Sequence, residues 1–87
     1  MRLEPTDDVV GQRLGDGFVL VHLNSNRIFE LSRTAGRFWD LLQSESDRRR
    51  IEEHMLAEFD VSERTLKAEV DWLVAELLSE DLVRDID

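Results

Sequence analysis

The chain has 87 residues, no cysteine, and a formal net charge of -9, which comes from 20 acidic against 11 basic side chains. This length predicts one domain spanning residues 1–87. The lack of cysteine excludes disulfides, thiolate metal sites and thiol nucleophiles. The acidic balance argues against nucleic acid as a partner, because binding to phosphates needs an excess of Lys and Arg.

Residues 1–8 are polar and contain a proline, so we expect a flexible lead-in to the folded domain. A weak strand pattern follows over residues 9–14, in which Gly11 suggests a bulge or a bend. The segment Gly15-Asp16-Gly17 predicts a tight turn, because glycine readily adopts the positive φ that such turns need.

Residues 18–23 are predicted to form a β-strand, whose side chains point alternately to the two faces of the sheet. Asn24-Ser25-Asn26 predicts a second turn, because asparagine tolerates left-handed backbone. Residues 27–31 then form a third strand, which completes an antiparallel meander. We expect one face of this meander to reach the core through Leu23, Phe29 and Leu31.

Three helices follow, and each has a polar residue placed to cap its N-terminus. The first is predicted from Ser32 or Thr34 to about Gln43, the second from Asp47 to about Glu58, and the third from Ser62 to about Ser79. Gly36 lies inside the first helix at a cost of about 1 kcal/mol relative to alanine, and a close approach of this turn to the sheet would offset that cost.

The core stripe of the third helix is predicted to be Leu66, Val70, Leu73 and Leu77. This order of elements predicts an α+β fold, a three-stranded antiparallel sheet followed by three helices, in a winged helix-turn-helix-like arrangement.

No set of residues in the sequence suits catalysis, metal binding or a cofactor. We expect His22 to be a half-exposed sheet residue and His54 to lie on a helix surface, and neither has a zinc-binding spacing. Acids that are adjacent in sequence point apart on any regular element and make poor acid–base pairs. The basic run Arg48-Arg49-Arg50 is bracketed by acids, which predicts a solvated helix face with i to i+4 partners. The sequence therefore favours a protein that is not an enzyme.

The third strand and the third helix have the features of a binding surface. Residues 27–31 form an outer strand that can accept an extended peptide, although such an edge can also be merely protected by Arg27 and Glu30. Beside the core stripe of the third helix lies a second row, which we expect to be half-exposed and to form the opposite wall of a groove. The alternative is a wide core stripe that reaches the second helix. The row consists of Lys67, Asp71, Val74 and Leu78, while Trp72 lies on the opposite flank.

The order and separation of several short segments resemble the PqqD-like family over roughly residues 9–84. These segments are Leu23-Asn24, Arg27-Ile28-Phe29-Glu30-Leu31, Ala35-Gly36, Phe38-Trp39, Leu41-Leu42, Phe59-Asp60-Val61, Glu69-Val70, Trp72-Leu73, Leu77 and Leu82-Val83. Two positions depart from the family pattern. Asp81 stands where the family usually has glycine, so the resemblance does not by itself predict the shape of the C-terminal turn, and Glu69 conservatively replaces an aspartate.

This resemblance implies a RiPP recognition element, a non-catalytic adaptor that binds the leader segment of a ribosomally synthesised precursor peptide. In the family the leader adds antiparallel to the third strand and lies against the third helix. Carried over by position, the peptide-binding residues are Arg27, Ile28, Phe29, Glu30, Leu31, Lys67, Val70, Asp71, Val74 and Leu78.

A free-standing acidic domain of this size resembles the leader-binding proteins of lasso-peptide pathways, whose partners are a leader peptidase and a ring-closing enzyme. The alternatives are a PqqD-type peptide chaperone for a radical enzyme, a winged-helix DNA-binding regulator, and a structural subunit of a larger enzyme. The longest apolar run, over residues 18–21, is too short to span a membrane, and the N-terminus lacks the apolar segment of a signal peptide. We therefore expect a cytoplasmic protein without a membrane partner.

Overall fold

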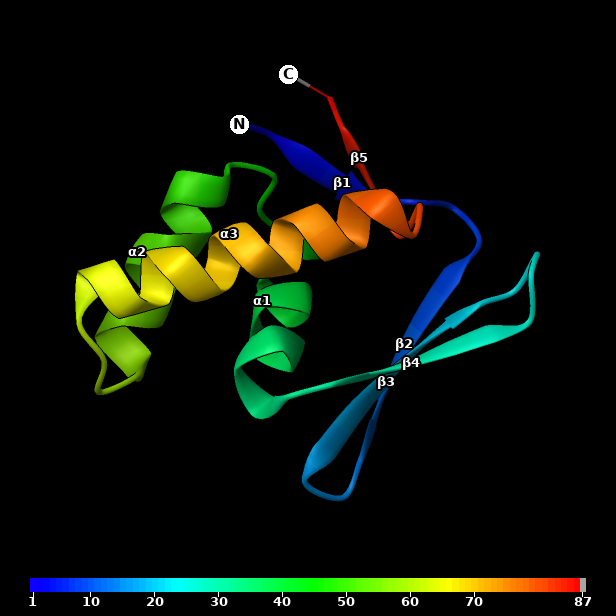
Figure 1. Ribbon diagram of the computed structural model, residues 1–87, viewed down its shortest axis with the longest axis horizontal. Helices are drawn as coiled ribbons and strands as arrows, with labels where there is room; N and C mark the ends of the chain where they lie inside the picture. Colours follow the sequence, from blue (N-terminus) through cyan, green and yellow to red (C-terminus); the bar gives the residue numbers. More distant parts are fainter. Residues whose placement is uncertain (87) are drawn as a thin grey trace.

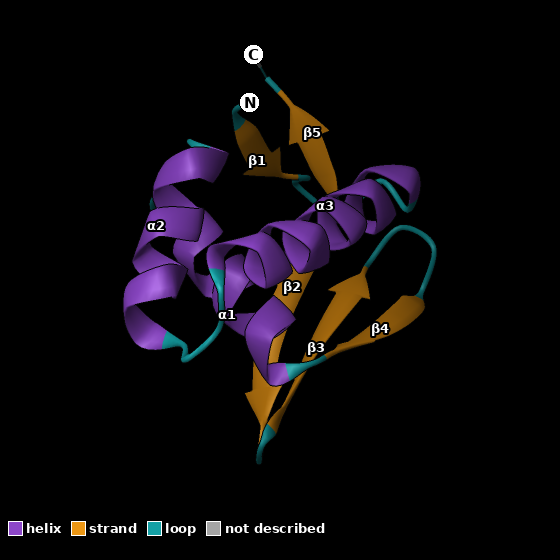
Figure 2. Ribbon diagram, turned by 60° about the vertical axis from the view of Figure 1, so that its left-hand side comes forward, coloured by secondary structure: helices purple, strands orange, loops and turns teal. Residues whose placement is uncertain are grey.

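The computed structural model describes residues 1–86 as an α+β fold with two antiparallel sheets and three helices (Figure 1). In chain order the elements are β1 (Leu3–Pro5), β2 (Val9–Leu14), β3 (Gly17–His22), β4 (Arg27–Leu31), α1 (Arg33–Leu42), α2 (Arg48–Glu58), α3 (Glu63–Ser79) and β5 (Val83–Asp85). The three-stranded sheet has the order β2-β3-β4, as expected, and β1 pairs with β5 in a second sheet. Figure 2 shows α3 crossing above the three-stranded sheet, with its C-terminal end towards the β3–β4 turn.

The β2–β3 hairpin is continuous from the pair Val9 and His22 to the pair Leu14 and Gly17, so the expected bulge at Gly11 is absent. Gly11 is instead a site of close approach. A Cβ added there would lie 2.7 Å from the indole nitrogen of Trp39 in α1. The glycine therefore lets the indole of α1 lie against the backbone of β2.

The N-terminal residues are not a flexible lead-in, which corrects our expectation. Leu3 is fully buried, and its N–H donates to the carbonyl of Ser46 at 2.8 Å. β1 lies beside β5, with Leu3 opposite Asp85 in the register, and the two strands run side by side in Figure 1. A strand of three residues is too short to show a period, so its sequence gives no signal.

The three predicted helices are confirmed, and so are the residues that cap them. Ser32, Asp47 and Ser62 each use a side-chain oxygen to accept a hydrogen bond from a backbone N–H in the first turn. Each cap satisfies a donor that has no partner within its helix, which typically stabilises a helix by about 1 kcal/mol. These local contacts explain why the sequence predicted the helix starts correctly.

The core lies between the helices and the inner face of the sheet. Its members include Phe18, Leu20, Phe38, Trp39, Ile51, Met55 and the predicted α3 stripe of Leu66, Val70, Leu73 and Leu77. Two expectations about side chains in the sheet are wrong. Leu23 is 55% exposed, because it follows Val19 and Val21 on the outer face, whereas His22 is only 8% exposed, because it shares the inner face with Leu20.

Gly36 shows the predicted close approach between α1 and the sheet. A Cβ at this position would lie 2.9 Å from the Cβ of Phe18, which is buried. Helix propensity alone predicts that Gly36→Ala stabilises the protein by about 1 kcal/mol. We expect the opposite sign, a loss of about 1–2 kcal/mol in the free energy of unfolding, because the added methyl overpacks the contact with β3. Urea unfolding of the variant decides between these outcomes, and a gain in stability would refute the close contact.

At the C-terminal turn Asp81 adopts left-handed backbone, although it stands where the resemblance expects glycine. Asp81 has a φ of +57°. The Leu82 N–H donates to the Leu77 carbonyl at 2.9 Å, and the Asp81 N–H donates to the Leu78 carbonyl at 3.2 Å. This pair of bonds is a Schellman motif, which ends α3 and directs the chain into β5.

Candidate peptide-binding groove

The outer edge of β4 carries backbone groups that the protein's own sheet does not use. The N–H of Leu23 donates to the carbonyl of Asp8 at 2.8 Å, so the backbone groups of Leu23 point towards the β2 side. Successive residues of a strand direct their N–H and C=O groups to opposite sides. The backbone groups of His22, Leu20 and Phe18 therefore point towards β4. Their register partners are Arg27, Phe29 and Leu31.

Ile28 and Glu30 therefore direct their N–H and C=O groups away from β3, towards the open edge. No other strand in the described part of the chain pairs with this edge. The N-terminus, which could have occupied it, pairs with β5 instead. An extended peptide can thus add to β4 without displacing any strand.

The side chains of β4 also divide between its two faces. Phe29 and Leu31 pack against the core, whereas Ile28 is 67% exposed on the outer face. The guanidinium of Arg27 lies 5.0 Å from the centre of the Phe29 ring and forms an ion pair of 2.5 Å with Glu80. This pair connects the start of β4 to the end of α3.

The ion pair with Glu80 shows which flank of α3 faces β4. Residues at intervals of three or four lie along one side of a helix, so the flank that contains Glu80 also contains Glu76, Leu73 and Glu69. Leu73 is only 8% exposed. We call these four residues the β4-facing flank of α3.

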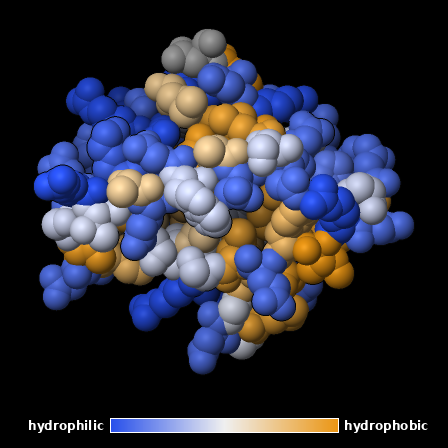
Figure 3. All heavy atoms as spheres, in the orientation of Figure 1, coloured by the Kyte–Doolittle hydropathy of each residue, from blue (hydrophilic) through white to orange (hydrophobic). Residues whose placement is uncertain are grey.

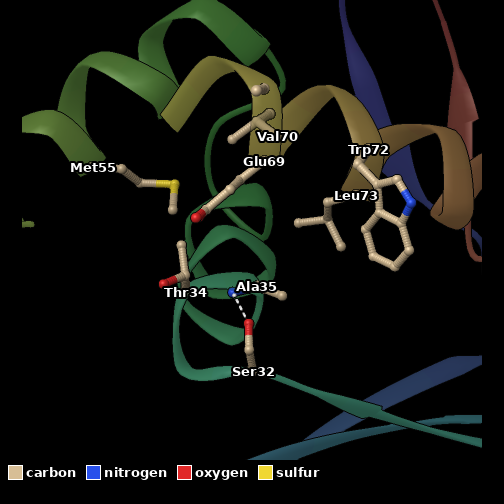
Figure 4. Close-up of a pocket in the computed structure, with 9 residues that line it drawn as sticks. Ser32, Thr34, Ala35, Met55, Glu69, Val70, Trp72 and Leu73 are labelled. Carbon is tan, nitrogen blue, oxygen red and sulfur yellow. Dashed lines mark hydrogen bonds between the residues drawn. The ribbon is translucent and has the colours of Figure 1, made fainter. Parts of the chain in front are cut away.

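A hollow of about 540 Å³ lies between this flank and the N-terminal turn of α1. Figure 4 shows Trp72, Leu73 and Glu69 on α3 above Ser32 and Ala35, where β4 passes into α1. The hollow is lined by Ser32, Thr34, Ala35, Met55, Ala68, Glu69, Val70, Trp72 and Leu73. Figure 3 shows apolar side chains gathered between α3 and the sheet, with hydrophilic side chains around them.

The structure does not bring the predicted α3 row opposite β4. Asp71 forms an ion pair with Arg48 of α2, and this guanidinium lowers the pKa of the Asp71 carboxyl. Lys67 lines a separate hollow together with Arg48. Val74, which we expected to be half-exposed, is 2% exposed, and Leu78 packs partly against the core. Lys67 and Asp71 therefore face α2 and Val74 belongs to the core, which agrees with the alternative of a wide core stripe.

Ten residues were predicted to bind the peptide, and five of them lie on α3. Of these five, Val70 lines the hollow where β4 passes into α1, whereas Lys67, Asp71, Val74 and Leu78 do not. The other lining residues on α3 were not among the predicted binding residues, although Trp72 was expected either to cap the domain or to contact a partner. They are Ala68, Glu69, Trp72 and Leu73. The exposed indole of Trp72 was the available signal, because a large aromatic side chain outside the core stripe commonly marks a contact surface.

The basic run at the start of α2 confirms the predicted i to i+4 partners for Arg48 and Arg49, but the Arg48 side chain is only 12% exposed and is therefore not on a solvated face. Arg48 pairs with Glu52 at 3.0 Å, Arg49 with Glu53 at 3.4 Å, and Arg50 approaches Glu45 at 3.9 Å. His54 is exposed and lies 3.0 Å from Glu58. Within residues 1–86 no group of three or more His, Asp or Glu side chains could hold a metal ion, and no helix there has the length and apolar character to cross a membrane.

Comparison with known proteins relates this architecture to one family. Two solved structures resemble the chain, one described as TbiB1 in complex with the TbiA(beta) leader peptide and the other as lasso peptide synthetase B1 complexed with the leader peptide. The first has 25% sequence identity and a TM-score of 0.86, and the match covers 97% of this chain and 98% of that one. The second has 15% sequence identity and a TM-score of 0.84, and the match covers 98% of this chain and 100% of that one. At this identity it supports the fold alone. No curated protein sequence matches the chain. The family model for coenzyme PQQ synthesis protein D (PqqD) matches residues 17–83, and the chain therefore belongs to the PqqD family, as its sequence motifs indicated.

Proposed function

We propose that the protein is a non-catalytic adaptor that binds the leader segment of a ribosomally synthesised precursor peptide by strand addition to β4. The observation that carries this proposal is the open edge at Ile28 and Glu30, together with the apolar hollow where β4 passes into α1. A relative with the same fold, TbiB1, was solved with a leader peptide, which supports the same class of ligand here.

The direction of β4 predicts the direction of the peptide. A strand that adds antiparallel places its N-terminal part beside Leu31 and the hollow, and its C-terminal part beside Arg27. Apolar side chains near the start of the bound segment would then enter the hollow next to Trp72 and Leu73. The region after that segment would leave the domain at the ion pair of Arg27 and Glu80, free to reach other proteins.

The pathway partners belong to the same proposal. The resemblance of the sequence to the leader-binding proteins of lasso-peptide pathways supports this extension, and TbiB1, at 25% identity, was solved with a leader peptide. This likeness favours a leader peptidase and a ring-closing enzyme as the proteins that receive the bound precursor. The family description favours the alternative, in which the protein delivers a peptide to the pathway of coenzyme PQQ. Both roles use the same peptide-binding edge, and a cytoplasmic location suits both.

Amide hydrogen exchange tests the strand addition directly. Using the TbiA(beta) leader as the probe, we expect the amides of Ile28 and Glu30 to exchange rapidly in the free protein and to become protected on binding. The amides of Phe29 and Leu31 bond to β3 and are expected to be protected in both states, so they provide an internal control. Protection confined to other segments, such as the flank of Lys67 and Asp71, would contradict binding at β4.

A further inference from the structure

The groove between β4 and α3 carries unbalanced negative charge. On the β4-facing flank of α3, Glu80 is paired with Arg27, but Glu69 and Glu76 form no ion pair within residues 1–86, and both are exposed. Many acids elsewhere in residues 1–86 form ion pairs with arginine, whereas Glu69 and Glu76 are left to attract an incoming cation.

An aromatic ring lies between the two carboxylates of α3. Trp72 is 68% exposed and lines the hollow beside Glu69. It follows Glu69 by three residues and precedes Glu76 by four, so all three side chains lie on neighbouring positions of the helix surface. An exposed indole is the strongest side-chain partner for a cation over its ring face, and a flanking carboxylate adds a charged acceptor for its hydrogen bonds.

We propose that this groove selects a peptide strand that presents an arginine or lysine side chain to α3, where Glu69, Trp72 and Glu76 hold it. The proposal rests on strand addition to β4 and specifies the chemistry of the peptide that adds. Side chains on one face of the added strand recur about every 7 Å, and Glu69 and Glu76 lie about 10 Å apart along the helix. The site therefore accepts one cation between the carboxylates or two cations at positions i and i+2. Arginine fits best, because its planar guanidinium can stack on the indole while it bonds to a carboxylate.

A selection experiment from random sequences identifies the preferred peptide. A display library of random twelve-residue peptides is selected against the wild-type protein and against the double variant Glu69→Gln/Glu76→Gln. We expect the wild type to enrich peptides with a basic residue at a fixed distance from an apolar residue, and the variant to lose this preference. A wild-type consensus without a basic position, or an unchanged basic preference in the variant, would overturn the proposal.

Synthetic copies of the most enriched peptide, with arginine or with its neutral analogue citrulline at the basic position, provide the affinity measurement. We expect the double variant to bind the arginine peptide about tenfold more weakly than wild type does, because it loses charge-assisted hydrogen bonds to the guanidinium. The citrulline peptide should bind both proteins alike. The control Asp16→Asn/Asp60→Asn removes the same charge at two exposed positions outside the groove and should change affinity less than about twofold. An equal loss in this control would show a general charge effect and overturn the specific site.

Amide exchange of Ile28 with the same peptide separates this proposal from the proposed function. Protection of Ile28 by both the arginine and citrulline peptides, with equal affinity, would retain strand addition and reject the cation site. Absence of protection with every selected peptide would reject strand addition and the cation site together.

Discussion

Replacing Ile28 with proline is expected to weaken leader-peptide binding at least tenfold while the protein stays folded. The N–H of Ile28 points to the open edge, so proline removes a donor that the protein's own sheet does not use. Proline is tolerated on an edge strand in this orientation. The lost peptide hydrogen bond contributes about 1 kcal/mol, and the pyrrolidine ring also blocks the approach of the added strand. Calorimetric titration with the TbiA(beta) leader, beside urea unfolding of the free variant, measures both effects.

Two matched variants test whether the weaker binding of Ile28→Pro comes from the lost backbone N–H at the open edge. Ile28→Ala keeps the N–H and shortens a side chain on the outer face, so we expect it to bind within about threefold of the wild type. Phe29→Pro removes an N–H that bonds to β3, so we expect it to disrupt the β3–β4 pairing and destabilise the fold. If Ile28→Pro bound the peptide as tightly as wild type, the edge of β4 would not be the binding site.

Truncation of Leu3 to alanine is expected to lower the free energy of unfolding by about 2–4 kcal/mol, although Leu3 lies almost at the N-terminus. Its side chain is fully buried and belongs to the core cluster together with Val83 of β5. Truncation leaves a cavity where two short strands close over the helices. For a domain of this size the loss corresponds to a decrease in melting temperature on the order of 10–25 °C.

Leu14→Ala is the control, because it makes the same chemical change at a side chain that is 55% exposed. We expect it to cost less than about 1 kcal/mol. Thermal unfolding of both variants compares them directly. If Leu3→Ala had as small an effect as the control, the N-terminal residues would be the flexible lead-in that their polar sequence suggested.

These two experiments address separate parts of the molecule. The first tests an edge that is open to a ligand, and the second tests the packing that holds the helices and both sheets together. Because the N-terminal strand pairs with β5, it stabilises the domain while leaving the edge of β4 open. This arrangement removes the main structural objection to peptide binding, which was that the chain's own N-terminus could occupy that edge.

The sequence by itself determined the elements whose causes are local. Ser32, Asp47 and Ser62 begin the three helices because their side chains bond to backbone N–H groups a few residues away. The alternation in β3 and the glycine turn before it define a hairpin in the same way. The order of these elements, with the aromatic and leucine motifs, also indicated the PqqD family, which the family match confirmed.

Only the tertiary structure decided which flank of α3 borders the groove. A helical period identifies the buried stripe, but the flanks on its two sides look alike in sequence, and we assigned Lys67 and Asp71 to the wrong side. Contacts distant in sequence resolve this choice: Arg27 with Glu80, and Arg48 with Asp71. The pairing of β1 with β5 was hidden for the same reason, because each strand has three residues and is stabilised by partners from the other end of the chain. Local propensity cannot encode contacts that form only when the whole chain packs.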